Sequence, residues 1–364
     1  MSTFAPGRLR IKAAGGALAA IALVGGSVAA GSEERGSVEP RAGIGEVRVM
    51  SFNIRYGTAD DGDDAWPNRR ALVFDVIRAF DPDVLGIQEA LAFQIDQLAG
   101  ALPGHEVIGV GRDDGARAGE FSAILVARAR FEIVASGTFW FSDTPEAPGS
   151  MSWGNRIPRI STWARLRDRD TGRRFSVYNV HWDHESQPSR ERSAALLLER
   201  IAARADSAEP VLVTGDFNAG EANPAFRMLV ESDAIALRDT YRDLHPNATD
   251  TGTFNGFEGL RGGDKIDAVL ASEGWCTRGA EIVRTAEDGR YPSDHFPVAA
   301  VVEEGEPATC ERGEHGRRRR ERGDGGPKRG SAPGQTSASF SVYTRPNRSV
   351  ASTRTSAIPG VNGA

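Results

Sequence analysis

The chain has 364 residues, a formal charge of −6 at neutral pH and two cysteines. Both ends are net basic, so the part between them is more acidic than the whole chain. An acidic domain of this kind is not a broad nucleic-acid-binding surface. Neither cysteine belongs to a histidine-containing cluster, which argues against a catalytic thiol.

Residues 1–31 have the pattern of a secretory signal peptide. Arg8, Arg10 and Lys12 form a basic start, an apolar run follows over 13–28, and small residues close it. The alternative is an uncleaved membrane anchor, but the apolar run of about 16 residues is shorter than the roughly 20 that a spanning helix needs. We therefore predict a secreted protein with no stable membrane span after cleavage.

The composition of residues 303–364, rich in Arg, Gly and Ser, predicts a disordered tail. They have an Arg run at 317–320 and few large apolar residues, so they cannot offset the entropy of ordering. Residues 44–302 contain no linker and no internal repeat, which predicts one catalytic domain. A disulfide between Cys276 and Cys310 would join tail and domain, and export permits it; two free thiols are the alternative.

Strands and helices alternate along this domain, which is typical of an α/β fold. Helices are expected over 66–80, 92–102 and 189–205, the last with Ala195, Leu198, Ile201 and Ala202 on its apolar side. Strands are expected over 47–52, 84–87, 105–110, 122–127, 131–141, 160–166, 175–180, 210–214, 265–270 and 298–302, the last two being the final strands.

Polar clusters recur where these strands end, and ligand sites of layered α/β folds are assembled at strand ends. Hydrolysis of a phosphate ester needs the anionic charge neutralised and a water aimed in line. A hard divalent cation with oxygen ligands does both. The clusters supply carboxylates, amides and two imidazoles suited to that chemistry: Asn53, Glu89, Asn179 with His181, Asp216 with Asn218, Asp267, and the run Ser293-Asp294-His295.

Several of these residues have a plainer alternative when each is taken alone. Glu89 can be a solvated residue at a strand end, and Asn53 a turn former before the loop that follows it. Asp216 and Asn218 can form an Asx turn that closes a strand. As a metal site, Glu89 would supply a carboxylate and Asn53 an amide oxygen.

Two carboxylates are the expected partners of the two histidines. We pair His295 with Asp267 and His181 with Glu120, because a carboxylate on one ring nitrogen orients the other. The alternatives are a surface ion pair for Asp267 and a solvated loop residue for Glu120. A transition-metal site built on the histidines of 181–184 is a further alternative.

Taken in order, these motifs resemble the endonuclease/exonuclease/phosphatase superfamily, whose members are deoxyribonuclease I-like. The resemblance spans residues 46–302. It implies a four-layer α/β sandwich, in which two mixed β-sheets pack face to face and helices cover both outer faces. It also implies dependence on Mg²⁺ or Mn²⁺. The motifs that carry it are Phe52-Asn53-Ile54, Gln88-Glu89, Asn179-Val180-His181, Gly215-Asp216-Phe217-Asn218, Ile266-Asp267 and Ser293-Asp294-His295.

The resemblance also implies roles for the site residues. Glu89 is the principal metal ligand, with Asn53 and Asp294 beside the metal. Asp267 orients His295, and Glu120 pairs with His181. Six further residues position the attacking water or act on the phosphate and the leaving oxygen: Glu120, His181, Asp216, Asn218, Asp267 and His295.

Four further segments, 66–70, 137–142, 158–163 and 253–257, resemble a bacterial, often exported branch of the superfamily. Val180 and Trp182 depart from the Thr and Leu that are usual around His181, so we expect a changed pocket shape with unchanged chemistry. Arg159 and Arg192 are candidate phosphate contacts; packing and helix capping are the alternatives.

These features favour a secreted, monomeric phosphoesterase that acts on a phosphorylated small molecule or a phospholipid headgroup. The alternative is an extracellular nuclease that cleaves DNA or RNA, gripping phosphates through its metal and the Arg-rich stretches at 112–130 and 156–174. A non-enzymatic module is disfavoured because every motif residue is retained.

Overall fold

The computed structural model describes residues 43–305 and residue 310. The predicted signal peptide lies outside the described residues, as does the predicted tail apart from 303–305 and 310. Within the described part, no helix is long and apolar enough to cross a membrane. Both cysteines of the chain are disulfide-bonded, so the alternative of two free thiols is wrong.

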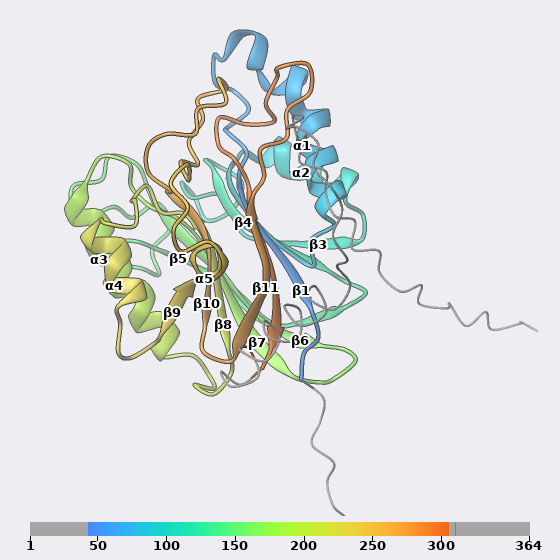
Figure 1. Cartoon of the computed structure of the whole chain (residues 1–364). Helices are drawn as coiled ribbons and strands as arrows, with labels where there is room; N and C mark the ends of the chain where they lie inside the picture. The colour runs from blue at the N-terminus through green and yellow to red at the C-terminus, as the bar shows by residue number, and fades with distance from the viewer. Residues whose placement is uncertain (1–42, 306–309, 311–364) are drawn as a thin grey trace, which may run out of the picture. The chain divides into compact units, whose positions relative to one another are not determined.

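Two six-stranded mixed sheets form the centre of the fold (Figure 1). Their orders are β11-β12-β1-β2-β4-β3 and β5-β6-β7-β8-β10-β9, so the third and fourth strands of each are the parallel pairs β1–β2 and β7–β8. The first sheet contains β1 (Val47–Asn53), β2 (Val84–Ala90), β3 (His105–Ile108), β4 (Phe121–Ala127), β11 (Trp275–Ile282) and β12 (Val298–Glu304). The second contains β5 (Phe131–Trp140), β6 (Ile160–Asp168), β7 (Arg174–His181), β8 (Val211–Asp216), β9 (Leu237–Asp239) and β10 (Asp267–Ser272).

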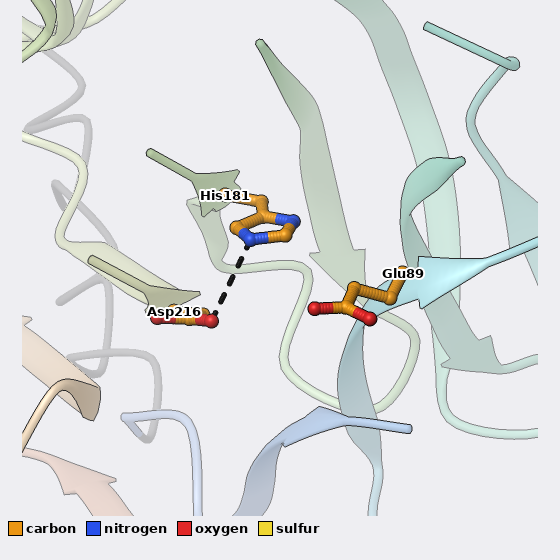
Figure 2. Close-up of side chains that lie close together, drawn as sticks. All are labelled: Glu89, His181 and Asp216. Carbon is orange, nitrogen blue, oxygen red and sulfur yellow. Dashed lines mark ion pairs between the residues drawn. The ribbon is translucent and has the colours of Figure 1, made fainter. Parts of the chain in front are cut away.

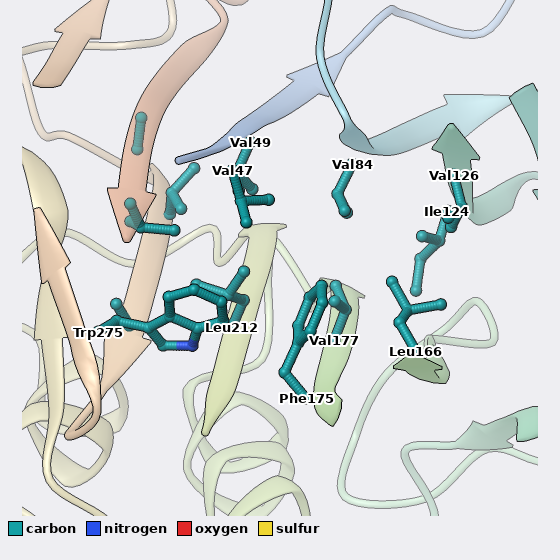
Figure 3. Packing of buried hydrophobic residues seen from close by; sticks show 14 of the residues in the cluster. Val47, Val49, Val84, Ile124, Val126, Leu166, Phe175, Val177, Leu212 and Trp275 are labelled. Atoms are coloured by element: carbon teal, nitrogen blue, oxygen red, sulfur yellow. The ribbon is translucent and has the colours of Figure 1, made fainter. Parts of the chain in front are cut away.

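Three apolar clusters define four layers. Alternate residues of β1, such as Val47 and Val49, face Phe175 and Val177 of β7 in the cluster between the sheets (Figure 3). The intervening residues of the first sheet pack on α1 (Trp66–Phe80) and α2 (Ala92–Ala101). The outer face of the second sheet packs on α3 (Gln187–Ala202) and α4 (Pro224–Val230). The expected four-layer sandwich is confirmed; short elements at its surface are η1 (Gly62–Asp64) and α5 (Thr240–Leu244).

Two details of the expected element pattern are wrong. The buried side of α3 carries Ala194, Leu197 and Ile201, whereas Ala195 and Ala202 are exposed. β11 lies between the two strands expected to be the last. It is a sheet-edge strand with half-exposed central residues and a bulge, which hides the alternation that reveals a strand.

A buried amide, Asn179, fastens the two sheets to each other beneath the edge where the motif strands end. Its Nδ2 donates to the carbonyl oxygens of Ile87 and Ala123 in the first sheet, both at 2.9 Å. Its Oδ1 accepts from Gln88 Nε2 at 2.6 Å and from Thr214 Oγ1 at 2.9 Å. All its polar capacity is used inside the core, so Asn179 is a structural residue and not part of the expected polar cluster.

We expect Asn179→Ala to lower the free energy of unfolding by about 3 kcal/mol, because buried carbonyls and the Gln88 amide lose their partner and each such group costs about 1–3 kcal/mol. Urea denaturation measures the change. The exposed Asn247 provides the control, and Asn247→Ala should stay within about 0.5 kcal/mol of the parent. A loss below about 1 kcal/mol for Asn179→Ala would contradict the cross-sheet role.

Candidate active site

The strand order brings the polar motifs to one edge of the sandwich. β1 ends at Asn53, β7 ends at His181 and β8 ends at Asp216. Glu89 is the next-to-last residue of β2. Paired parallel strands run in the same direction, so their carboxyl ends share an edge. The antiparallel β10 begins at Asp267, directly opposite Asp216, and the segment before β12 reaches the same edge.

Asn53 connects carboxylates from both sheets. Its Nδ2 donates to Glu89 Oε1 and to Asp216 Oδ2, both at 2.9 Å. Its Oδ1 accepts the backbone N–H of Arg55 at 3.0 Å, so the amide nitrogen faces the carboxylates, where we had expected the oxygen. Glu89 Oε2 also accepts the backbone N–H of Tyr56 at 3.1 Å. These bonds hold the Glu89 carboxylate at a fixed place beside Asp216.

Asp294 lies beside this group and is buried. Ser293 Oγ donates to its Oδ1 at 3.2 Å, and Arg55 Nε lies 3.7 Å from its Oδ2. Burial raises the pKa of Asp294, while His295 and Arg55 act in the opposite direction. Ser293 Oγ also lies 2.7 Å from the Asn53 carbonyl oxygen, so its single hydroxyl hydrogen is shared between that carbonyl and the Asp294 carboxylate.

His295 and Asp267 form the expected pair. His295 Nδ1 lies 2.8 Å from Asp267 Oδ2, and the other ring nitrogen, Nε2, lies 3.9 Å from Asp216 Oδ2. Burial lowers the pKa of His295, but the carboxylates of Asp267 and Asp216 outweigh it and raise the pKa well above its ordinary value. The ring is thus an imidazolium at neutral pH, held between two carboxylates.

His181 is held differently, because its partner is a buried guanidinium. Arg159 Nη1 lies 2.9 Å from His181 Nε2 and can only donate, so Nε2 is unprotonated. Burial, with Arg159 and Arg112 next, lowers the pKa of His181 well below its ordinary value. The neutral ring then carries its proton on Nδ1, which lies 3.9 Å from Glu120 Oε2.

Glu120 is not a solvated loop residue, although its main partner is not the expected histidine. Arg112 holds both of its oxygens, with Nη1 at 2.6 Å from Oε2 and Nη2 at 2.7 Å from Oε1. Burial raises the pKa of Glu120 to about 7 although Arg112 opposes the shift. Glu120 therefore couples Arg112 to His181 at the rim of the site.

The alternative of a transition-metal site on the two histidines of 181–184 does not fit. Arg159 donates from Nη1 to His181 and from Nη2 to His184 Nδ1 at 2.7 Å. A guanidinium thus occupies the position from which a metal would bind both rings. Asp183 is also engaged, since its Oδ1 accepts two backbone N–H groups and its Oδ2 lies 3.5 Å from Arg159 Nε.

Two overlapping groups of side chains could hold a cation within the described residues. In one group, Glu89, His181 and Asp216 point toward one another from three strands (Figure 2). In the other, Asp216 is joined by Asp267 and His295. In each group the ligand atoms lie within 4.8 Å of one another. Asp216 belongs to both and is the common centre of the site.

Asp216 is also the first residue of a tight turn. Its Oδ1 accepts the backbone N–H of Asn218 at 2.9 Å, which is the Asx turn named above as an alternative. The Asn218 Nδ2 donates to the carbonyl of Trp182 at 3.0 Å, and Asn218 has a positive φ of 46°. The turn fixes Oδ1, so Oδ2 is directed toward Asn53 and the two histidines.

The raised pKa of Asp216 predicts how the free energy of unfolding depends on pH. Burial, with Asp267 next, raises this pKa to about 7 from an ordinary 3.8. A carboxyl whose pKa is higher in the folded than in the unfolded state stabilises the fold while it is protonated. That contribution is lost as the pH rises from the unfolded pKa toward the folded pKa of about 7. In a chelator, Asp216→Asn should therefore gain stability relative to wild type between pH 4 and 7, by about 1.4 kcal/mol for each unit of pKa difference.

Urea denaturation of both proteins at several pH values measures this difference. A relative stability that is flat across that range would show that Asp216 is ionised in the metal-free fold. Asp75→Asn, at an exposed position of α1, is the matched control and should show no such trend.

A sequence profile described as the Endonuclease/Exonuclease/phosphatase family matches residues 50–295. The chain belongs to this family. Its members are hydrolases of phosphoester bonds, so the convergent carboxylates and histidines form the site of a phosphoester hydrolase.

Solved structures of bacterial proteins agree with this membership. An endonuclease/exonuclease/phosphatase from Bacteroides vulgatus is 32% identical with a TM-score of 0.67, covering 71% of this chain and 99% of that one. A mannosyl-6-phosphatase from Bacteroides thetaiotaomicron is 32% identical with a TM-score of 0.64, covering 70% and 99%. Nocturnin of Drosophila melanogaster is 25% identical over 57% of this chain and 35% of its own length.

The residues that sequence reasoning missed are arginines that organise the site. Arg112 was noted only within an Arg-rich stretch, yet it holds Glu120. Arg69 is completely buried and donates to the carbonyls of Ile54 and Pro292 at 2.7 and 2.8 Å, which joins the loops before and after the site. Sequence motifs do not reveal the Arg69 contacts, because the partners are backbone oxygens, one of them 223 residues away in sequence.

The two residues that depart from the family pattern around His181 lie in the core. Val180 and Trp182 are fully buried in the outer cluster of the second sheet, where Trp182 packs on Phe217 with ring centroids 5.0 Å apart. Their departure from the usual residues therefore changes the core behind the site. Arg192 stacks over Trp153 at 5.8 Å, which is a packing contact.

Proposed function

We propose that this protein is a divalent-metal-dependent phosphomonoesterase that releases phosphate from a small phosphorylated molecule by in-line attack of water. The observation that carries the proposal is the placement of Asp216. Its Oδ2 is hydrogen-bonded to Asn53 and lies 3.6 and 3.9 Å from the Nε2 atoms of His181 and His295. An amide, a neutral imidazole and an imidazolium thus surround one carboxylate oxygen.

The chemistry of this set fits a hard cation. Three carboxylates lie close together at one edge of the sandwich: Glu89, Asp216 and Asp267. Within the described residues, Asp267 Oδ1 is buried without a hydrogen-bond partner. Oxygen-rich sites of this kind suit Mg²⁺ or Mn²⁺. Glu89 and Asp216 would hold the ion, which would neutralise phosphate charge and make a bound water more acidic.

The protein's own groups divide the remaining work. Asp216 would be kept ionised by a bound cation, so its carboxylate could orient the attacking water and accept a proton from it. The imidazolium of His295 offers positive charge and a proton at Nε2 to a phosphoryl oxygen. Arg159, which donates to neutral His181, adds a second cation that interacts with Asp216.

A small phosphomonoester is favoured over a polymer by two facts. The region between the basic ends is acidic, which opposes an extended polyanion. The relative from Bacteroides thetaiotaomicron that is named a mannosyl-6-phosphatase is 32% identical, whereas the relatives named nocturnin and Ccr4 exoribonuclease are 25% and 26% identical. A nuclease is the second candidate, and the assay below includes it.

The test uses purified full-length protein with Mg²⁺, Mn²⁺ or a chelator, and measures phosphate release and plasmid or RNA cleavage. We expect release from mannose 6-phosphate with Mg²⁺, loss of it in chelator, and loss of it in His295→Ala. His245→Ala, an exposed histidine that contacts the Ala280 carbonyl, is the control and should keep full activity. Nicking of plasmid that depends on His295, without release from any small ester, would overturn the proposal.

We also propose that the protein is secreted, supported by the signal-peptide pattern of residues 1–31. Mass spectrometry of the N-terminus from culture medium should find it beginning near residue 31. An intact N-terminus in the membrane fraction would instead support an anchor.

A further inference from the structure

Phe254 is an exposed aromatic residue in contact with the site. Half of its surface, 50%, is exposed, whereas the residues on both sides of it, Thr253 and Asn255, are completely buried. Its ring lies edge-on to the imidazole of His295, with centroids 5.3 Å apart and planes at 73°. The ring thus contacts His295 on one side, and half of the residue is exposed to solvent.

The backbone around Phe254 is fixed to the strands that carry the site. Thr253 Oγ1 accepts the backbone N–H of Asp267 at 3.0 Å. The backbone N–H of Asn255 donates to the carbonyl of Asp294 at 2.6 Å, and Phe254 forms a β-bridge with His295. The ring is therefore presented to solvent by a rigid segment and not by a frayed loop.

An open aromatic face beside a phosphate site has a direct chemical use. A phosphate bound at His295 Nε2 would place the group on its ester oxygen within reach of Phe254. Flat apolar surfaces, such as a base or the C–H face of a saturated ring, stack on aromatic side chains and gain affinity in doing so. A short flexible chain such as glycerol offers no such face.

We propose that Phe254 determines specificity by stacking on a ring carried by the phosphate ester, so that ring-bearing phosphomonoesters are the preferred substrates. This rests on the proposed function for the phosphate site. The shared chemistry is a flat ring face next to the phosphate, whether from a sugar or from an aromatic group. Phe254 acts on binding of the substituent, while Asp216 and His295 act on the phosphate itself.

Binding of phosphonates tests the proposal without turnover, because they are not hydrolysed. In isothermal titration with Mg²⁺, wild type should bind phenylphosphonate or cyclohexylphosphonate about tenfold more tightly than methylphosphonate. Phe254→Ala should lose this preference and Phe254→Tyr should keep it. Met228→Ala, which truncates an exposed apolar residue of α4, is the control and should bind like wild type. The phenyl and cyclohexyl arms separate an aromatic from a saturated ring.

Steady-state kinetics adds a second readout. For mannose 6-phosphate, Phe254→Ala should raise KM about tenfold with kcat within twofold, and glycerol 1-phosphate should be unaffected. Equal loss of kcat on both esters, with a shifted pH profile, would mean that Phe254 only shields His295 and would overturn the proposal. Absence of a ring preference in phosphonate binding would overturn it as well. A ring preference in binding without turnover of any ester would instead refute the proposed function and leave the stacking role established.

Discussion

Asp267→Asn should lower kcat by about 10²–10⁴-fold, the range found when a carboxylate that orients a catalytic histidine loses its charge. Asp267 Oδ2 holds His295 Nδ1 at 2.8 Å from the first residue of β10. The amide keeps the shape of the side chain but removes the charge that sustains the imidazolium. Because the change is isosteric, KM should move much less than kcat.

The pH profile separates this role from simple loss of structure. The carboxylates of Asp267 and Asp216 raise the pKa of His295, so the imidazolium is present through neutral pH and is lost as pH rises through the raised pKa. In Asp267→Asn the pKa falls, and the alkaline loss of activity should move to lower pH by at least about one unit. The exposed Asp264 gives the control Asp264→Asn, with an unchanged profile. Wild-type kcat in Asp267→Asn would refute the pairing.

The sequence contains enough to predict the layers and the edge that carries the site. Short, mostly apolar runs predicted β1, β2, β7 and β8, and the parallel pairing within β1–β2 and β7–β8 brings their carboxyl ends to one edge. The pairing of His295 with Asp267 was also predicted correctly, because both belong to recognisable motifs. The distance of 2.8 Å confirms it.

The partners of His181 could not be predicted in the same way. Arg159 reaches its ring from the loop before β6, and Arg112 takes the carboxylate of Glu120 that we had assigned to it. The hydrogen-bond partner of each group depends on which guanidinium is buried next to it. A motif gives residue types but not which side chains are buried. Asn179 shows the same limit, since a motif position next to the site proved to serve the core.

Glu89→Gln should lower kcat/KM by about 10³-fold or more, because an ion held here supplies several kcal/mol of charge stabilisation and each 1.36 kcal/mol is a factor of ten. The backbone supports a functional reading of this residue. Glu89 has a φ of 65°, a left-handed conformation that costs a non-glycine residue of order 1 kcal/mol or more. The hydrogen bonds to Asn53 Nδ2 and the Tyr56 N–H hold it there.

Replacing the strained Glu89 should relieve the backbone strain but remove the carboxylate, so stability should be kept while activity is lost. In chelator, Glu89→Gly should be at least as stable as wild type, because glycine adopts positive φ without cost. It should be as inactive as Glu89→Gln, and for both variants Mg²⁺ should raise the melting temperature less than for wild type, since a ligand stabilises only the fold that binds it. Glu199→Gln, on the exposed side of α3, should match wild type in all three measurements. Full activity and an undiminished Mg²⁺ shift in Glu89→Gln would move the metal away from β2, leaving Asp216, Asp267 and His295 as its remaining ligands.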